Sequence, residues 1–110
     1  MSKAVFWQRG ETIDYVNKTE AIIEENTVLA IGSRIGITGM KIRPNEKGSV
    51  HVSGVFEFDK AAGEIALGAD VYWDAAAGKI TTTSSSNTKA GFAVEEAGSS
   101  STKVIVKINA

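Results

Sequence analysis

Short hydrophobic runs separated by glycine are the feature of this chain that most constrains its fold. Eleven glycines recur roughly every ten residues, and there is a single proline. The runs between the glycines are rich in β-branched and aromatic residues, and no window of helical length carries a helical hydrophobic period. Many short strands at a spacing of about 8–12 residues are typical of all-β domains. We therefore expect an all-β fold, a small barrel or sandwich of short antiparallel strands with long polar loops and at most one short helical turn.

Several segments carry the alternation or the β-branched content of strands. They are Lys3–Gln8, Thr12–Asn17, 27–31, 34–38, Ser49–Phe58 and Lys103–Asn109. Gly54, in the middle of the longest segment, predicts a bulge or a bend. The segment Glu20–Asn26 fits either a helical turn or a loop. The polar stretches Thr81–Thr88 and Gly98–Thr102 predict exposed loops or strand ends.

The stretch GADVYWDAAAGKIT, residues 68–81, predicts a hairpin. Val71 and Trp73 fall on one face of its first strand. Asp74 can cap the turn with its side chain, and Gly78 can take the positive φ that closes it. An indole in such a place more often packs in a core than against a partner subunit, and least often lines a ligand site. We expect this hairpin to have a structural role.

The length of 110 residues indicates one domain, spanning 1–110. Within it, shifting the sequence by 43 positions aligns many hydrophobic residues. The aligned identities are Ile22 with Ile65, Val28 with Val71, Ile37 with Ile80, Thr38 with Thr81 and Gly48 with Gly91. We interpret this weak echo as two similar β-meander halves.

Charge and composition exclude several classes of function. Twelve basic and thirteen acidic residues are interspersed, so no basic block exists to track a phosphate backbone, and we expect no nucleic-acid partner. The first ten residues, MSKAVFWQRG, are too short an apolar stretch for a signal peptide or a membrane span, and we expect no membrane partner. The chain has no cysteine, which excludes disulfides and thiolate zinc sites.

The residues that could do chemistry are few. His51 is the single histidine, and it falls in the polar register of a strand whose neighbours are serines. Asp70 and Asp74 would lie about 13 Å apart along an extended strand, too far for a hydrolase dyad. The segment GSRIG at 32–36 lacks a following helix and is not a dinucleotide fingerprint. We therefore expect no enzyme, no catalytic residue, no cofactor and no metal site.

Taken together, five segments resemble the small capsid cement, or head decoration, proteins of tailed bacteriophages and prophages. The segments are KAVFWQRGETIDYVN, SRIGIT, GSVHVSGVFEFDKAAG, ADVYWDAAAGKITTT and NTKAGFAVEEAG. The likeness runs over nearly the whole chain in the same order. Its most specific parts are the GVFEF strand, the VYWDAAAGK hairpin and the NTKAGFA stretch at 87–93.

The resemblance implies an all-β protein that binds the outside of an expanded icosahedral head. Such a protein bridges neighbouring subunits of the major capsid protein, commonly as a homotrimer. It would be made in the cytoplasm of the bacterial host and would reside on the exterior of the virion. The family supplies no catalytic residue to carry over.

For partner contacts, Phe6, Trp7 and Arg9 are the candidates at the chain end, because aromatic and arginine side chains are common interface anchors. We expect this N-terminal segment to face the shell, while the alternative is that Trp7 packs inside the barrel. Trp73 is a further candidate contact. A different function also fits the residues, a small binding module for a carbohydrate or peptide that uses Tyr72 and Trp73 as a stacking platform. A hydrolase centred on His51 lacks the partner residues.

Overall fold

A computed structural model describes residues 3–110, which form nine β-strands and no helix. The strands are β1 (Thr12–Val16), β2 (Val28–Ile31), β3 (Arg34–Thr38), β4 (Lys47–His51), β5 (Val55–Asp59), β6 (Asp70–Asp74), β7 (Lys79–Thr81), β8 (Thr88–Ala93) and β9 (Lys103–Ile108). The expectation of an all-β fold is confirmed.

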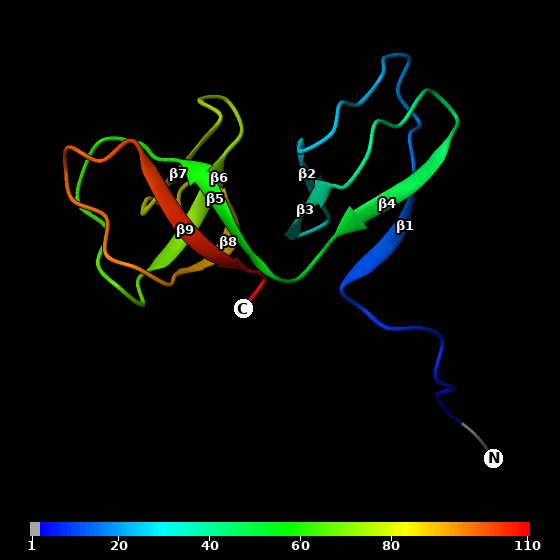
Figure 1. The fold of residues 1–110 in the computed structure, drawn as a ribbon, viewed down its shortest axis with the longest axis horizontal. Helices are drawn as coiled ribbons and strands as arrows, with labels where there is room; N and C mark the ends of the chain where they lie inside the picture. The colour runs from blue at the N-terminus through cyan, green and yellow to red at the C-terminus, as the bar shows by residue number, and fades with distance from the viewer. Residues whose placement is uncertain (1–2) are drawn as a thin grey trace.

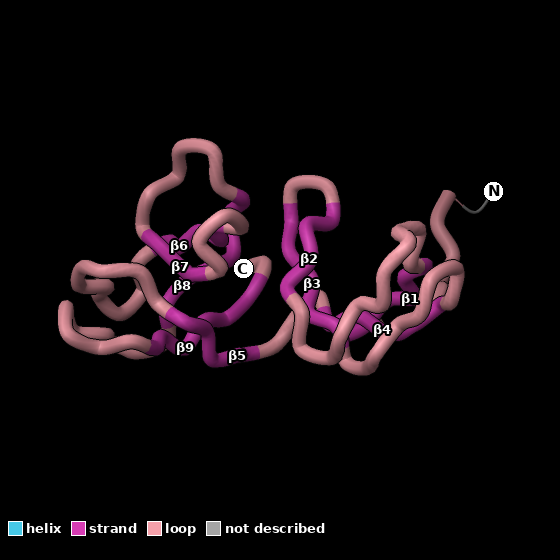
Figure 2. The backbone as a smooth tube through the Cα atoms, turned by 90° about the horizontal axis from the view of Figure 1, so that it is seen from above, coloured by secondary structure: helices cyan, strands magenta, loops and turns pink. Residues whose placement is uncertain are grey.

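The strands form two antiparallel sheets that lie next to each other. The first sheet has the order β1-β4-β3-β2, and the second has the order β5-β9-β8-β6-β7. Figure 1 shows the first sheet on the right and the second on the left, and Figure 2 shows the same separation from above. The arrangement is sandwich-like and flat, with extents of 48 × 40 × 22 Å. In the second sheet a bridge between Lys60 and Ile80 links the ends of β5 and β7, but neither sheet is closed.

The two sheets repeat one topology. Replacing β1, β2, β3 and β4 of the first order by β5, β6, β8 and β9 reproduces the second order, and β7 alone has no counterpart. The backbone hydrogen bonds outside the strands repeat as well. The matched sets are Asn17 N to Glu46 O with Lys60 N to Thr102 O, Asn26 N to Thr38 O with Gly68 N to Ala93 O, and the reciprocal bridge Ile23–Ile42 with Ile65–Ala97. The interpretation of two similar halves is therefore correct.

The single offset of 43 holds only at the start of each half. It relates Thr12 of β1 to Val55 of β5. The offset is 42 at the matched bridges of Ile23 and Ile65. It grows after the second strand of the first half, because β7 and its flanking loops are inserted between β6 and β8, the counterparts of β2 and β3. The match of Gly48 with Gly91 was therefore wrong, since Gly36 takes the place of Gly91 beside the preceding strand. The matches of Ile37 with Ile80 and of Thr38 with Thr81 were wrong for the same reason. Ile65 and Val71 correspond to Ile23 and Leu29, one position after the residues first aligned with them.

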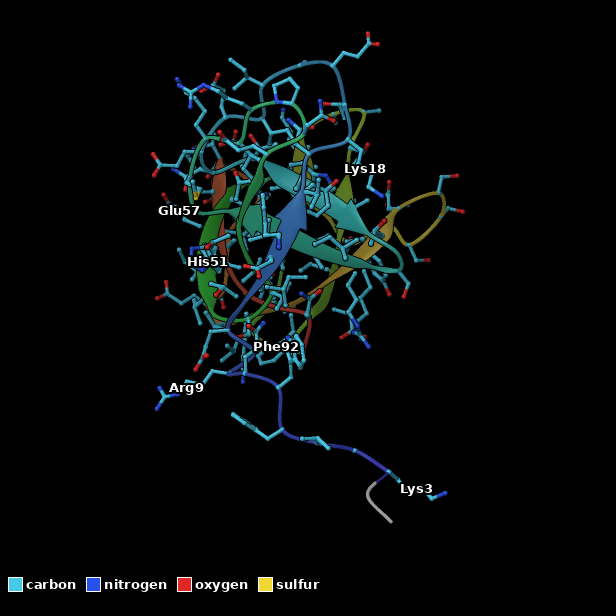
Figure 3. The ribbon with its side chains drawn as sticks, turned by 90° about the vertical axis from the view of Figure 1, so that its right-hand side faces the viewer. Lys3, Arg9, Lys18, His51, Glu57 and Phe92 are labelled. Atoms are coloured by element: carbon cyan, nitrogen blue, oxygen red, sulfur yellow. The ribbon has the colours of Figure 1, made fainter. Side chains whose placement is uncertain are left out.

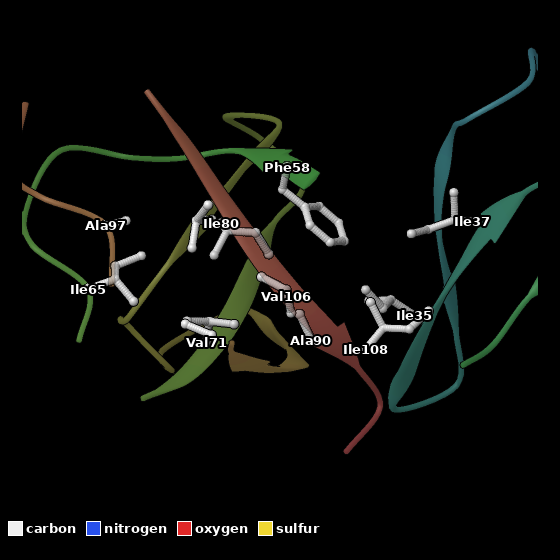
Figure 4. Close-up of a cluster of buried hydrophobic side chains, with 12 residues drawn as sticks. Ile35, Ile37, Phe58, Ile65, Val71, Ile80, Ala90, Ala97, Val106 and Ile108 are labelled. Carbon is white, nitrogen blue, oxygen red and sulfur yellow. The ribbon is translucent and has the colours of Figure 1, made fainter. Parts of the chain in front are cut away.

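One apolar cluster joins the two halves. Most of its buried members come from the second half, and Ile35 and Ile37 of β3 join it from the first (Figure 4). Ile42 and Val50 are fully buried within the first half. Burial of this kind is the main source of stability in a domain of this size, at roughly 25 cal/mol per Å² of apolar surface. The contact between the halves is thus built of the same residues that form the core.

Asn109, directly after β9, adds a polar link between the halves. Its Nδ2 donates to the carbonyl oxygens of Ile35 and Val52, both at 2.8 Å, and its Oδ1 accepts from the amide of Ile35 at 3.2 Å. Its own backbone amide donates to the carbonyl of Ala90 at 2.7 Å. Because Ile35 and Ala90 precede the matched glycines of the two halves, this residue ties together two equivalent points of the repeat.

Two local expectations were wrong. Lys3–Gln8 forms no strand, because no other strand lies beside it to complete the hydrogen bonds. Ser49–Phe58 is not one bent strand, since the chain leaves β4 at Val52 and enters β5 in the other sheet at Val55. Of the two alternatives for Glu20–Asn26, the loop is correct, and it carries the bridge of Ile23. The polar stretch Thr81–Thr88 forms the end of β7, an exposed loop and the first residue of β8, as expected.

Candidate interaction surface

The segment 3–10, which we call the arm, extends from the start of β1 without secondary-structure partners. All of its residues are exposed, and Val5, Phe6 and Trp7 show 80%, 82% and 91% of their surface. Figure 1 shows the arm leaving the body of the molecule, and Figure 3 shows Lys3 and Arg9 projecting from it. Three consecutive bulky apolar side chains in water indicate an interaction site. The expected contact residues Phe6, Trp7 and Arg9 all lie on this arm, whereas the alternative that Trp7 packs inside the body is wrong.

The root of the arm is fixed to the first sheet. The carbonyl of Glu11 accepts a hydrogen bond from the amide of Val52 at 2.9 Å. Immediately afterwards Thr12 pairs with His51, and β1 follows β4 to its end. The arm is therefore free from Gly10 outwards and held at a defined point.

Trp73 lies on β6 of the second sheet and is half-buried. It packs against the central apolar cluster, with its ring centroid 6.1 Å from that of Phe58 and the two planes at 54°. A tilted aromatic pair at this distance is a favourable packing geometry. The hairpin holds the indole as expected, since Asp74 Oδ1 accepts from the amides of Ala76 and Ala77. Trp73 and the candidate contact residues of the arm therefore lie on different elements.

A polar pocket of about 390 Å³ opens beside this hairpin. It is lined by Asp74, Ala75, Ala76, Thr81, Thr83, Ser85, Ser86 and Asn87. All but the first of these belong to the inserted segment that contains β7 and have no counterpart in the first half. Tyr72 and Trp73 are not part of the lining, so the stacking platform considered from the sequence does not face this pocket.

The residues that the sequence offered as candidates for catalysis make contacts of the kind that support a fold. The ring of His51 packs against Phe56 at 5.5 Å between centroids. Asp70 lies 3.8 Å from the ammonium of Lys89, and Asp74 caps its own turn. Within residues 3–110, no three His, Asp or Glu side chains gather closely enough to hold a metal ion.

Ion pairs lie on the surface and are dispersed. The ammonium of Lys103 donates a hydrogen bond to Asp59, and this bond lowers the pKa of the Asp59 carboxyl and raises the pKa of Lys103. Both side chains are more than half exposed, so solvent screens the pair. The ion pairs in the part of the chain that the structure covers thus add little to the stability of the fold.

The two sheets leave four edge strands, and these differ in charge. β1 carries Asp14, β5 carries Glu57 and Asp59, and β7 carries Lys79. β2, with the sequence VLAI, carries no charge. Charged residues on edge strands are the usual protection against pairing with another chain. The sequence analysis did not single out this edge, although the uncharged run was the available signal.

Among residues 3–110 there is no helix with the length and apolar character that a membrane crossing requires. No curated protein and no solved structure matches the chain significantly. A family model described as phage cement protein matches residues 7–108, which include the last part of the arm and all nine strands. The resemblance noted from the sequence is confirmed, and the chain belongs to the phage cement protein family.

Proposed function

We propose that this protein binds the exterior of the expanded head of a tailed phage and stabilises it by bridging major capsid subunits. The observation that carries the proposal is the family match over residues 7–108. The protein acts by binding alone, without catalysis. It is made in the cytoplasm of the bacterial host and ends on the virion surface.

The shape and the charge of the molecule support this role. A body 22 Å thick along its shortest axis can cover a shell closely without projecting far from it. The formal net charge of −1 keeps electrostatic repulsion between crowded copies small. A protein that binds only the expanded shell stabilises that state by mass action, and repeating the contact over the shell multiplies its effect.

The proposed partner contacts are Phe6, Trp7 and Arg9 on the arm. Their side chains are exposed and of the types that dominate binding energy at interfaces. We further propose that the protein works as a homotrimer, as the resemblance implies. Trp73 is a further proposed contact through its exposed part, although it also packs on the core.

Binding to purified heads tests the proposal directly. The protein should bind expanded heads saturably, bind unexpanded heads weakly, and raise the temperature at which the expanded heads lose their DNA. Trp7→Ala should weaken binding by tenfold or more, since a hot-spot aromatic contributes about 2 kcal/mol or more. His51→Ala is the matched control and should bind like the parent protein. Equal binding to both head forms, or no binding, would contradict the proposal.

A second function has one observation in its favour. The pocket lined by Thr81, Thr83, Ser85, Ser86 and Asn87 presents hydroxyl and amide groups of the kind that bind sugar hydroxyls. A carbohydrate-binding module would bind members of a glycan panel, and Asn87→Ala would abolish that binding. Capsid binding without any glycan binding removes this alternative.

A further inference from the structure

The repeat indicates what the arm is. Moving back by 43 positions from β4 and β5 leads to residues 4–8 and to β1. The arm therefore precedes β1 as β4 precedes β5. Its sequence AVFWQ is rich in residues that favour strands. The arm has the sequence and the position of a strand, but no strand among residues 3–110 pairs with it.

The chain also enters both halves in the same way. The amide of Val52 donates to the carbonyl of Glu11 at 2.9 Å, and the amide of Ile108 donates to the carbonyl of Gly54 at 3.0 Å. Glu11 lies just before β1, and Gly54 just before β5. The root of the arm thus makes the same backbone hydrogen bond that the second half makes just before β5, where the chain passes from one sheet to the other.

A vacant edge lies in the same molecule. In the second half β7 pairs with the outer edge of β6, through Tyr72 with Thr81, Trp73 with Ile80 and Asp74 with Lys79. The equivalent edge of the first half belongs to β2, and among residues 3–110 no strand pairs with it. β2 is also the edge strand without a charge, and Ala30 within it is exposed. The edge is open and lacks the usual protection against strand pairing.

We propose that the arm of one copy pairs as an additional strand with β2 of a second copy of this chain. The five arm residues 4–8 are long enough to pair with all four residues of β2, and backbone hydrogen bonds supply the pairing. Successive side chains of the added strand point to opposite faces, so Phe6 and Trp7 cover different faces of the sheet. One of these faces already carries Val28, which packs against the central cluster.

The arm's own β2 is the less suitable acceptor. β1 and β2 form opposite edges of the sheet, separated by about 14 Å across three strand spacings. The arm leaves from β1 and would have to fold back across a face of the sheet. A neighbouring copy requires no such reversal. Donor and acceptor are different surfaces, so the contact is head-to-tail, and we propose that three copies related in this way close into a ring. This deepens the homotrimer proposed above and does not depend on capsid binding.

Sedimentation of the purified protein provides the first test. The full chain should sediment as a closed oligomer. A chain that lacks residues 2–8 should sediment as a monomer, and its circular dichroism should show that it is folded. A full chain that is monomeric over the whole accessible concentration range would overturn the proposal, whether the arm then folds back or binds only the shell. An oligomer that survives removal of the arm would overturn it as well.

Single substitutions on the two kinds of edge separate pairing at β2 from unspecific adhesion of the arm. Ala30→Lys places a charge on the open edge and should shift the protein towards monomer. Glu57→Lys, on the exposed and already charged edge strand β5, is the matched control and should leave the oligomer intact. Equal effects of the two variants would argue against β2 as the acceptor.

Cysteine trapping then identifies the partner edge, since the natural chain has no cysteine. Copies with Phe6→Cys are mixed with copies with Ala30→Cys and oxidised in air. A disulfide-linked heterodimer of the two variants should form. The mixture of Phe6→Cys with Glu57→Cys should form far less of it. If the control mixture crosslinks equally well, the arm does not select β2.

Discussion

At the scale of single residues, Asn109 shows how a side chain can replace a strand. β4 pairs with β3 only at Ile37 and Thr38, which leaves the backbone of Ile35 without that neighbour. The amide group of Asn109 both donates to and accepts from the backbone of Ile35, as a peptide group of a neighbouring strand would. The residue has a φ of 56°, a left-handed conformation that asparagine tolerates better than most residues.

Substitution of Asn109 should therefore loosen the contact between the halves. Asn109→Gly keeps the backbone conformation but removes three side-chain hydrogen bonds, and it should lower the free energy of unfolding by about 2–3 kcal/mol. Asn109→Ala should lose about 1 kcal/mol more, because alanine is strained at positive φ. Urea unfolding measures both. Asn87→Ala, which removes one exposed hydrogen bond, should cost less than about 1 kcal/mol. Asn109→Gly with parental stability would show that the link is not needed.

At the scale of elements, β8 and β9 approach so closely that one position between them accepts only glycine. A Cβ atom on Gly91 would lie 1.9 Å from the carbonyl oxygen of Lys107, and the φ of Gly91 is +145°. Backbone cannot yield as a flexible side chain can, so the strands would have to separate. The bulge between Val71 and Tyr72 lies opposite this point, where β6 pairs with β8.

Gly91→Ala should be among the most destabilising single changes in the chain. We expect a loss of more than about 3 kcal/mol in the free energy of unfolding, or failure to fold, from steric overlap with the strand backbone. Gly78→Ala is the matched control, because Gly78 also has a positive φ but has no atom within 4 Å of the added carbon. It should cost about 1 kcal/mol. Thermal unfolding followed by circular dichroism compares the two, and similar losses would contradict the steric argument.

The elements also show what the sequence could and could not predict. The alternation in Thr12–Asn17 and Lys103–Asn109 led to β1 and β9, because one face of β9 is buried and Ile13 and Tyr15 on one face of β1 are half-buried. β8 was missed, since its buried positions are Ala90, Gly91 and Ala93, small residues that carry little hydrophobic signal. The arm had a strand sequence but no strand, because pairing depends on a neighbour that the sequence does not name. The contact residues on the arm could be proposed from their types, whereas the open edge of β2 required the topology.

At the scale of the whole molecule, the shared cluster unites two similar halves. Ile35 and Ile37 of the first half are buried among residues of the second, so separation of the halves would expose apolar surface on both. We propose that residues 1–110 form one domain that unfolds as a unit. Circular dichroism, which reports on both sheets, and the fluorescence of Trp73, read in a Trp7→Phe background, should give coincident urea transitions. Two separated transitions would show that the halves are independent.

The insertion that contains β7 decides how many neighbours one molecule can engage. Without it, both halves would present an equivalent bare strand, and each copy with its single arm would offer two places for one incoming segment. Because β7 occupies one of them, every copy has one donor and one acceptor. Units of this valence join in a line that ends only when it meets its own beginning, and they do not branch into networks.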